Sequence, residues 1–184
     1  GVRFAGQLLA YTAMHEGLEV TWIPSYGPEM RGGTANCVVV ISDQPVGSPL
    51  VSRPQTAVVF NLPSFERYEP LVAAGGLLVY NESLIDRRSQ RPDIAQLPVP
   101  ALALADGLGD LRLMNMVMVG ALLTAHPVLP LDALRRALAA HLPAHRQDML
   151  AQNLAALDQG AACAAERTPA WRAAAFPLWG RGLK

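Results

Sequence analysis

Apolar and polar positions alternate in short blocks over the first part of the chain. Apolar residues recur at helical spacing over residues 2–15, and Gly17 follows where a helix C-terminal cap is expected. Residues 18–23 are rich in β-branched and aromatic side chains, so they are predicted to form a strand that Pro24 ends. The chain is therefore predicted to open with a helix and a strand.

Three further strands are predicted from short apolar runs bounded by turn residues. Residues 34–42 contain a continuous apolar run, which is typical of a well buried strand. Residues 56–62 and 77–81 are the other two, with a short helix between them that Ser64 is placed to cap. This alternation predicts an α/β, Rossmann-like fold with a mixed or mostly parallel sheet flanked by helices.

The pattern then changes twice. Residues 87–98 are polar and contain prolines, so they are predicted to be a surface excursion, and residues 99–104 a short extended piece that completes a sheet part of about 1–105. Residues 111–125 are apolar on nearly every side of the predicted helix, which indicates a helix packed on more than one side. One of these sides is a candidate contact surface for another chain.

Two more helices are predicted beyond Pro130, and they complete a C-terminal helical appendage. The second of them carries leucines at helical spacing from Leu150 and is expected to end at Gly160. The domain is thus predicted to span residues 1–163, with a helical part of about 106–163. Residues 164–184 form an aromatic-bearing tail, predicted to be disordered or docked on a partner.

Composition narrows the classes of partner. Fifteen basic and fifteen acidic residues cancel, which argues against binding to nucleic acid or to an anionic membrane surface. Charged residues make up only 16% of the 184, so part of the surface is expected to be buried against other chains. The longest apolar stretch, residues 111–123, is shorter than the roughly 18 to 20 residues of a membrane span.

Cysteine and histidine usage gives no metal site. Cys37 and Cys163 are far apart and neither belongs to a CxxC pair, so no disulfide, zinc or iron–sulfur site is predicted, and a reducing cytoplasm fits best. Cys37 is interpreted as a small core residue. The histidines are interpreted as structural or solvated, because none has a partner at metal-ligand spacing: His15, His126, His141 and His145.

The loop over residues 24–33 is the main candidate for chemistry. It follows a strand end, where open α/β sheets bind ligands, and its two glycines allow close approach of a partner to the backbone. The guanidinium group of Arg31 can donate two parallel hydrogen bonds to a carboxylate or phosphate. The ring of Tyr26 can stack on a planar group of a ligand. From the residues alone, an ordered loop with Arg31 paired to Glu29 is an equally good interpretation.

Gly1 and three strand-end residues are further candidates. Gly1 stands at the mouth of the first helix, where backbone N–H groups bind anions, although a glycine that only turns the chain into the helix is the favoured explanation. Asn61, Asn81 and Glu82 follow predicted strands and are second-tier candidates, since such residues also cap turns.

The order of several segments resembles the gamma subunit of the 2-oxoacid:ferredoxin (acceptor) oxidoreductases. Residues 17–22 and 25–37 carry the resemblance, and residues 41–49, 61–64 and 75–81 continue it in the same order. Similar residues also occur at 115–117 and 120–123, whereas the tail beyond Cys163 has no counterpart.

The resemblance implies a subunit of an enzyme that oxidatively decarboxylates a 2-oxoacid to an acyl-CoA. Thiamine pyrophosphate, Mg and iron–sulfur clusters would be held by alpha, beta and ferredoxin-like delta subunits, with ferredoxin as electron acceptor, and this chain would not be active alone. The gamma chain would help to engage coenzyme A and to close the active site. The implied cofactor-binding residues are Gly1, Tyr26, Met30, Arg31, Gly32, Gly33 and Asn36.

The resemblance also implies a glycine-rich Gly-x-Gly-Gly-x-Gly turn before the first helix. Gly1 looks like its last glycine, and the upstream strand and other glycines are not in this sequence. Two alternatives to the oxidoreductase subunit remain: a free-standing Rossmann-type module that binds a nucleotide, and a purely structural subunit. The identity of the 2-oxoacid is not encoded in any motif of this chain.

Overall fold

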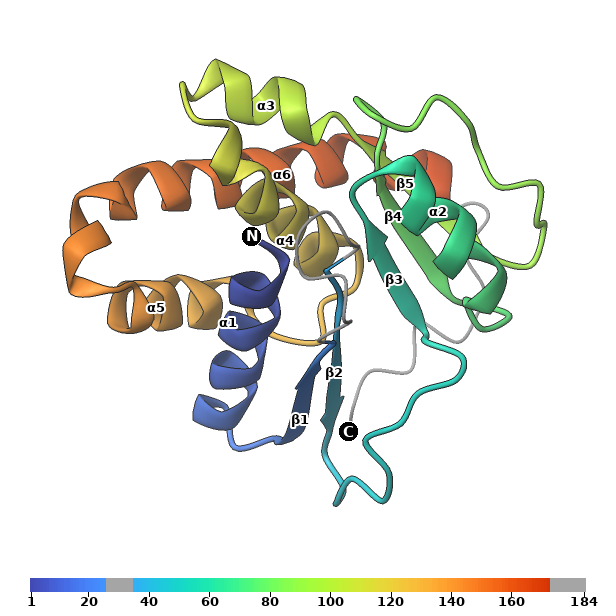
Figure 1. Ribbon diagram of the computed structural model, residues 1–184, viewed down its shortest axis with the longest axis horizontal. Coiled ribbons are helices and arrows are strands. Elements are labelled where there is room, and N and C mark those ends of the chain that lie inside the picture. Colours follow the sequence, from blue (N-terminus) through green and yellow to red (C-terminus); the bar gives the residue numbers. More distant parts are fainter. Residues whose placement is uncertain (26–34, 173–184) are drawn as a thin grey trace.

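The computed structural model of the protein describes residues 1–25 and 35–172 (Figure 1). Five strands and six α-helices are formed within these ranges. The strands are β1 Glu19–Pro24, β2 Cys37–Ser42, β3 Thr56–Val59, β4 Leu77–Asn81 and β5 Ala95–Val99. The helices are α1 Val2–His15, α2 Leu62–Tyr68, α3 Ala101–Gly107, α4 Met114–Ala125, α5 Leu131–His141 and α6 Leu150–Arg172. The predicted α/β class is confirmed.

The strands form two separate ladders. β1 and β2 pair antiparallel as a hairpin, from Glu19 opposite Ser42 to Pro24 opposite Cys37. β3, β4 and β5 form a parallel sheet in that order. The mixture of parallel and antiparallel pairing agrees with the prediction, but β2 is half-buried along its length and not fully buried as its apolar run suggested, because helix α1 covers the hairpin on one face.

The central strand β4 is buried on both faces, as expected for a parallel sheet covered by helices. Leu77 and Val79 point into the larger core, which α1, α4 and α6 share. Leu78 and Tyr80 point the other way, into a smaller core closed by Phe65 of α2. Figure 1 shows α2 on one side of this sheet and α4 with α6 on the other. The period-two pattern of β4 thus distributes its side chains between two cores.

The segment after residue 87 differs from the prediction. Residues 95–99 are not part of a surface excursion but form strand β5, and residues 101–107 form helix α3 instead of an extended piece. Pro98 obscured the strand, yet β5 is a sheet edge, where proline costs no ladder hydrogen bond. The Gln96 side chain binds both backbone groups of Ser89, accepting from N at 2.7 Å and donating to O at 3.0 Å.

Two helix boundaries also differ from the prediction. Asn61, not Ser64, caps α2, and its Oδ1 accepts a hydrogen bond from the Ser64 N–H at 3.0 Å. Gly160 does not end the last helix, because α6 continues to Arg172. The expected 164–184 tail therefore begins as helix, and residues 173–184 lie outside the described ranges.

Helices α4 and α6 cross at two glycines, Gly120 and Gly160. This close crossing gives the glycine inside α6 a packing role. A Cβ atom on Gly120 would overlap the carbonyl oxygen of Leu157, and one on Gly160 would overlap the carbonyl oxygen of Val117. The two backbones are therefore in direct contact. The helices predicted as an appendage pack on the sheet and complete the main core. In the described ranges, no helix combines the length and the apolar character needed to cross a membrane.

Candidate functional site

The strands β3, β4 and β5 end on the same side of the parallel sheet, which we call the carboxyl edge. Asn81 connects the segments that meet at this edge. Its side chain is fully buried. Nδ2 donates to the Phe60 carbonyl oxygen and to the Met114 sulfur, each at 3.3 Å, and Oδ1 accepts from the Ser83 N–H at 3.2 Å. These contacts join the ends of β3 and β4 to the start of α4. Asn81 therefore has a structural role that holds the edge in shape.

The first turn of α1 lies against the same region. The Asn115 side chain donates to the carbonyl oxygen of Gly1 at 3.2 Å and accepts from the Met116 N–H at 2.9 Å. Gly1 is the N-cap of α1 and makes no side-chain cap, and the first turn carries no acidic residue. A Cβ on Gly1 would meet nothing within 4 Å. The positive end of the α1 dipole therefore lies beside the carboxyl edge.

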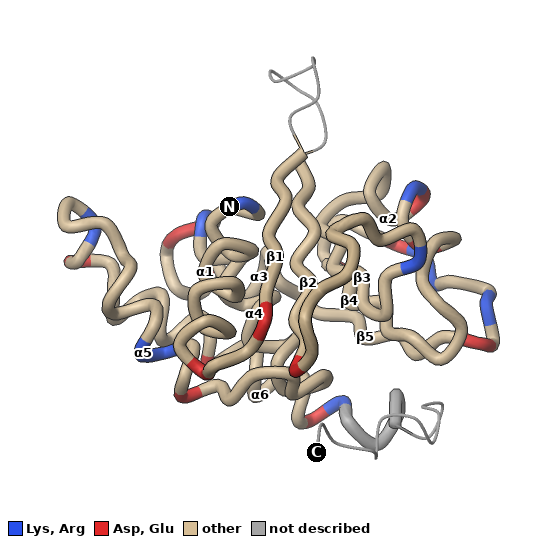
Figure 2. Tube along the Cα trace, turned by 90° about the horizontal axis from the view of Figure 1, so that it is seen from below, with Lys and Arg blue, Asp and Glu red and all other residues tan. Residues whose placement is uncertain are grey.

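The hairpin reaches the start of α1 from the other side. The Cys37 thiol lies 3.6 Å from the carbonyl oxygen of Val2, and the Ser25 N–H donates to the Asn36 carbonyl oxygen at 3.0 Å. Figure 2 shows β1 and β2 projecting beyond the rest of the chain on the side where the N-terminus lies. The described end of the β1–β2 hairpin therefore lies next to the first turn of α1.

Two of the predicted ligand-binding residues lie in the described ranges. Gly1 is at the helix mouth, and Asn36 is a half-buried residue whose backbone closes the end of the hairpin. The other five lie outside the described residues: Tyr26, Met30, Arg31, Gly32 and Gly33. For all seven residues the ligand-binding role stays a prediction.

A polar pocket of about 190 Å³ opens just past the end of β4. Its lining combines acidic and basic side chains with one phenol: Tyr80, Glu82, Ile85, Asp86, Arg87 and Arg88. Arg167 of α6 forms an ion pair with Glu82 at 2.7 Å and donates to the Pro98 carbonyl oxygen at 2.7 Å. Burial raises the pKa of the Tyr80 phenol, and the nearby Arg88 opposes that rise. At neutral pH Tyr80 is therefore a hydrogen-bonding group and not a base.

The second-tier candidates have structural partners. Asn61 caps α2, Asn81 joins two strands to α4, and Glu82 is paired with Arg167. Burial also raises the pKa of the Cys37 thiol, so the thiol is neutral and unsuited to nucleophilic attack. This agrees with the interpretation of Cys37 as a packing residue.

The polar side chains of Asn81 and Glu82 at the carboxyl edge are tied up in structural contacts. Within residues 1–25 and 35–172 no group of three or more His, Cys, Asp or Glu side chains could hold a metal ion. Sequence reasoning missed Asn115, which meets Gly1 across 114 positions. Its only sequence signal was an amide in an otherwise apolar helix.

Comparisons with known sequences agree with this architecture. The profile of the family described as pyruvate ferredoxin/flavodoxin oxidoreductase matches residues 1–163. Ketoisovalerate oxidoreductase subunit VorA of Methanothermobacter marburgensis is 41% identical over 123 residues, which cover 67% of this chain and 26% of that protein. The chain thus spans about a quarter of the first curated relatives. 2-Oxoglutarate synthase subunit KorC of Methanocaldococcus jannaschii is 28% identical over 87% of this chain and 86% of its own length.

Solved structures share the fold. The gamma subunit of keto/oxoacid ferredoxin oxidoreductase from Geobacter sulfurreducens superposes with a TM-score of 0.73 at 21% identity, over 89% of this chain and 90% of that one. The 2-oxoglutarate:ferredoxin oxidoreductase from Magnetococcus marinus, determined with 2-oxoglutarate, coenzyme A and succinyl-CoA bound, gives a TM-score of 0.79 at 24% identity, over 89% of this chain and 28% of that one. The resemblance drawn from the sequence is confirmed. The chain belongs to the pyruvate ferredoxin/flavodoxin oxidoreductase family.

Proposed function

We propose that this chain is the gamma part of a thiamine-dependent 2-oxoacid:ferredoxin oxidoreductase, which converts a 2-oxoacid to an acyl-CoA. Its role is to engage coenzyme A and to help close the active site. The observation that carries the proposal is the meeting of three features at one place: the open first turn of α1, the end of the β1–β2 hairpin, and the carboxyl edge. Thiamine pyrophosphate, Mg and iron–sulfur clusters belong to partner subunits.

The chemistry of coenzyme A suits this place. Its phosphates are anions that helix N-termini and arginine forks bind, and α1 offers an uncapped turn without an acidic residue. Arg31 is one of the nine residues between Ser25 and Ala35, and we propose that it binds a phosphate of coenzyme A. Binding a phosphate-rich thiol and excluding water would accelerate the reaction by positioning, with bond making left to the partner subunits.

The substrate class follows from the relatives' names. The relatives include proteins named for ketoisovalerate and for 2-oxoglutarate, so the proposed substrate is a 2-oxoacid of either kind. The bound coenzyme A and succinyl-CoA in the Magnetococcus enzyme support an acyl-CoA product for a chain of this fold. Transfer of electrons to ferredoxin is part of the same proposal.

Replacing Arg31 by alanine in the assembled enzyme tests the role in coenzyme A engagement. Loss of one charge-assisted hydrogen bond to a phosphate is expected to raise the KM for coenzyme A roughly tenfold or more, with kcat changed little. Arg31→Lys should recover part of the affinity, because it keeps the charge without the fork. Arg146→Ala is the matched control, since Arg146 is an exposed residue of the 144–149 turn.

The alternatives predict other results. A purely structural subunit would give an unchanged KM for coenzyme A in Arg31→Ala with assembly intact. A free-standing nucleotide-binding module would bind NAD or FAD tightly as an isolated chain, which calorimetric titration with NAD, FAD and coenzyme A measures. Either result would replace the proposal.

A further inference from the structure

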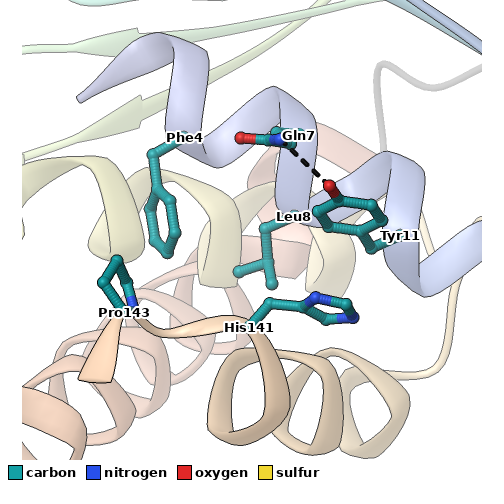
Figure 3. Close-up of a pocket in the computed structure, with 6 residues that line it drawn as sticks. All are labelled: Phe4, Gln7, Leu8, Tyr11, His141 and Pro143. Atoms are coloured by element: carbon teal, nitrogen blue, oxygen red, sulfur yellow. Dashed lines mark hydrogen bonds between the residues drawn. The ribbon is translucent and has the colours of Figure 1, made fainter. Parts of the chain in front are cut away.

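The pocket shown in Figure 3, of about 180 Å³, lies between α1 and the end of α5. Its polar side chains bind one another or a neighbour. Gln7 donates to the Tyr11 hydroxyl at 3.1 Å, and the ring of Tyr11 stacks on His141. The Nε2 atoms of His141 and His15 share a hydrogen bond at 3.1 Å. These contacts explain the pocket as part of the packing between the two helices.

The pocket past the end of β4 is bordered by a phenol that packing alone does not explain. Tyr80 is only 2% exposed, and its ring packs edge-on against Phe65 with the ring centroids 5.7 Å apart. The same residue lines the pocket of about 190 Å³. A phenylalanine ring would fill the same place in the core, whereas a buried phenol needs a partner for its hydroxyl. The hydroxyl therefore indicates a role at the pocket.

The charges that act on this phenol are net positive. They belong to Arg88, Glu82 and Arg167, and Arg88 has the largest effect of the three on the pKa of the phenol. Glu82 is paired with Arg167 at 2.7 Å, so the charge that remains unbalanced is that of Arg88. Arg87 also lines the pocket and forms an exposed ion pair with Glu66 at 3.3 Å. A guanidinium group beside a phenol that can donate its proton is a suitable donor set for an anion.

This pocket borders the region proposed above to engage coenzyme A. Met114 and Asn115 are consecutive residues at the start of α4. The Met114 sulfur accepts from Asn81, the residue that follows Tyr80, and the Asn115 side chain donates to Gly1 at the mouth of α1. Two places suited to anions are therefore joined through the first turn of α4. A ligand that carries phosphate groups at two separate positions can use both.

We propose that Arg88, together with the Tyr80 hydroxyl, binds the 3′-phosphate of coenzyme A. The inference rests on the proposed function and names the part of the ligand that this pocket recognises. Coenzyme A carries a diphosphate within its chain and a phosphate monoester on its ribose. The monoester is a terminal group with about two negative charges at neutral pH, so it can enter a small pocket end-on. The diphosphate is bonded on both sides and suits the first turn of α1.

The preference of the assembled enzyme for coenzyme A over 3′-dephospho-coenzyme A tests this assignment. The ratio of kcat/KM for the two thiols isolates the monoester, because the rest of the ligand is the same. We expect the unaltered enzyme to prefer coenzyme A by about 10- to 100-fold. Arg88→Gln should reduce this preference about tenfold and leave kcat/KM for the dephospho compound unchanged. Arg88→Lys should restore part of the preference, because lysine keeps the charge without the paired N–H groups.

Further variants separate ligand binding from a structural role. Tyr80→Phe keeps the ring packed against Phe65 and removes only the hydroxyl, so the preference should fall by roughly three- to tenfold with the fold intact. Asp86 is an exposed carboxylate that lines the same pocket and opposes an anion there. Asp86→Asn should therefore increase the preference, which a loss of structure could not do. Arg146→Gln is the matched control, because Arg146 is an exposed arginine outside the pocket.

The outcomes distinguish this inference from the proposed function. If the enzyme turns over coenzyme A but Arg88→Gln leaves the preference unchanged, or lowers kcat/KM for both thiols equally, the inference is wrong and the proposed function stands. If the assembled enzyme does not use coenzyme A at all, the proposed function is wrong and the inference falls with it. A preference that decreases in Arg88→Gln and increases in Asp86→Asn would support the assignment.

Discussion

Asn81 is the buried amide that the carboxyl edge depends on most directly. Replacement by alanine would remove the hydrogen-bond partner of the Phe60 carbonyl and of the Ser83 N–H and leave a cavity at a fully buried position. We expect Asn81→Ala to lower the free energy of unfolding by about 2 to 3 kcal/mol, measured by urea denaturation. Asn61→Ala, which removes an exposed helix cap, should cost about 1 kcal/mol. Equal losses for the two variants would contradict the structural role assigned to Asn81.

His126 gives the chain a pH dependence. Burial lowers its pKa from 6.5 to about 4, and its Nδ1 lies 3.0 Å from the Thr56 hydroxyl. Because the folded pKa is depressed, the folded state takes up the proton later than the unfolded state as the pH falls. The stability due to neutral His126 is therefore fully present above pH 6.5 and is lost between pH 6.5 and 4.

The expected size of this loss is at most about 3 kcal/mol, reduced by whatever solvent reaches the half-buried ring. Urea denaturation at pH 7 and pH 4.5 measures it. In His126→Gln the loss between these two pH values should be smaller than in the unaltered chain, because the titrating group is gone. The loss of unfolding free energy that remains in His126→Gln comes from protonation of carboxylates. An identical pH dependence in both proteins would show that His126 does not contribute.

At the scale of elements, the crossing of α4 and α6 is the most sensitive contact. Gly120→Ala or Gly160→Ala places a methyl group onto a backbone carbonyl of the other helix, which a flexible side chain cannot relieve. Each is expected to destabilise the fold by about 1 to 3 kcal/mol or more, despite the better helix propensity of alanine. Gly107→Ala in α3 is the control, because its Cβ would meet nothing within 4 Å, and it should be neutral or slightly stabilising. Thermal unfolding compares all three.

The elements predicted from the sequence are correct where local periodicity decides them and wrong where a distant segment decides them. The strand at 77–81 and the helix at 2–15 were predicted with their observed bounds, because local periodicity decides both. Gly160 was wrongly predicted to end a helix, since the reason for it lies in its contact with Val117 of α4, 43 positions away. Strand β5 was missed because Pro98 is acceptable only at an edge, which requires knowing the strand order.

The candidate site also combines features that local sequence patterns suggest with features that depend on packing between distant segments. A ligand site at the strand end beside Gly1 stays a prediction, and β1, which precedes the candidate loop, belongs to the antiparallel hairpin and not to the parallel sheet. The Asn115 contact with Gly1 and the meeting of His15 with His141 depend on packing between distant segments. For Tyr26, Met30, Arg31, Gly32 and Gly33 the expected ligand-binding role stays a prediction, as these positions lie outside the described residues.

At the scale of the whole molecule, the composition and the surface point to a chain that works in an assembly. Only 16% of residues are charged, the net charge is zero, and Leu50, Leu84 and Leu111 are large apolar side chains that are exposed. Low charge and exposed apolar side chains are expected of a subunit whose partners cover apolar surface.

Co-expression with the neighbouring genes tests this expectation. A tag on this chain should co-purify a chain that binds thiamine pyrophosphate, and acyl-CoA formation from a 2-oxoacid should require both. Mixing separately purified chains provides the control, because activity should appear only on assembly. Activity of this chain alone, or failure of the tagged full-length protein to retain any thiamine-binding partner, would contradict the assembly. Since coenzyme A is proposed to meet this chain at the α1 mouth, omission of the chain should abolish coenzyme A turnover while the partners still bind thiamine pyrophosphate.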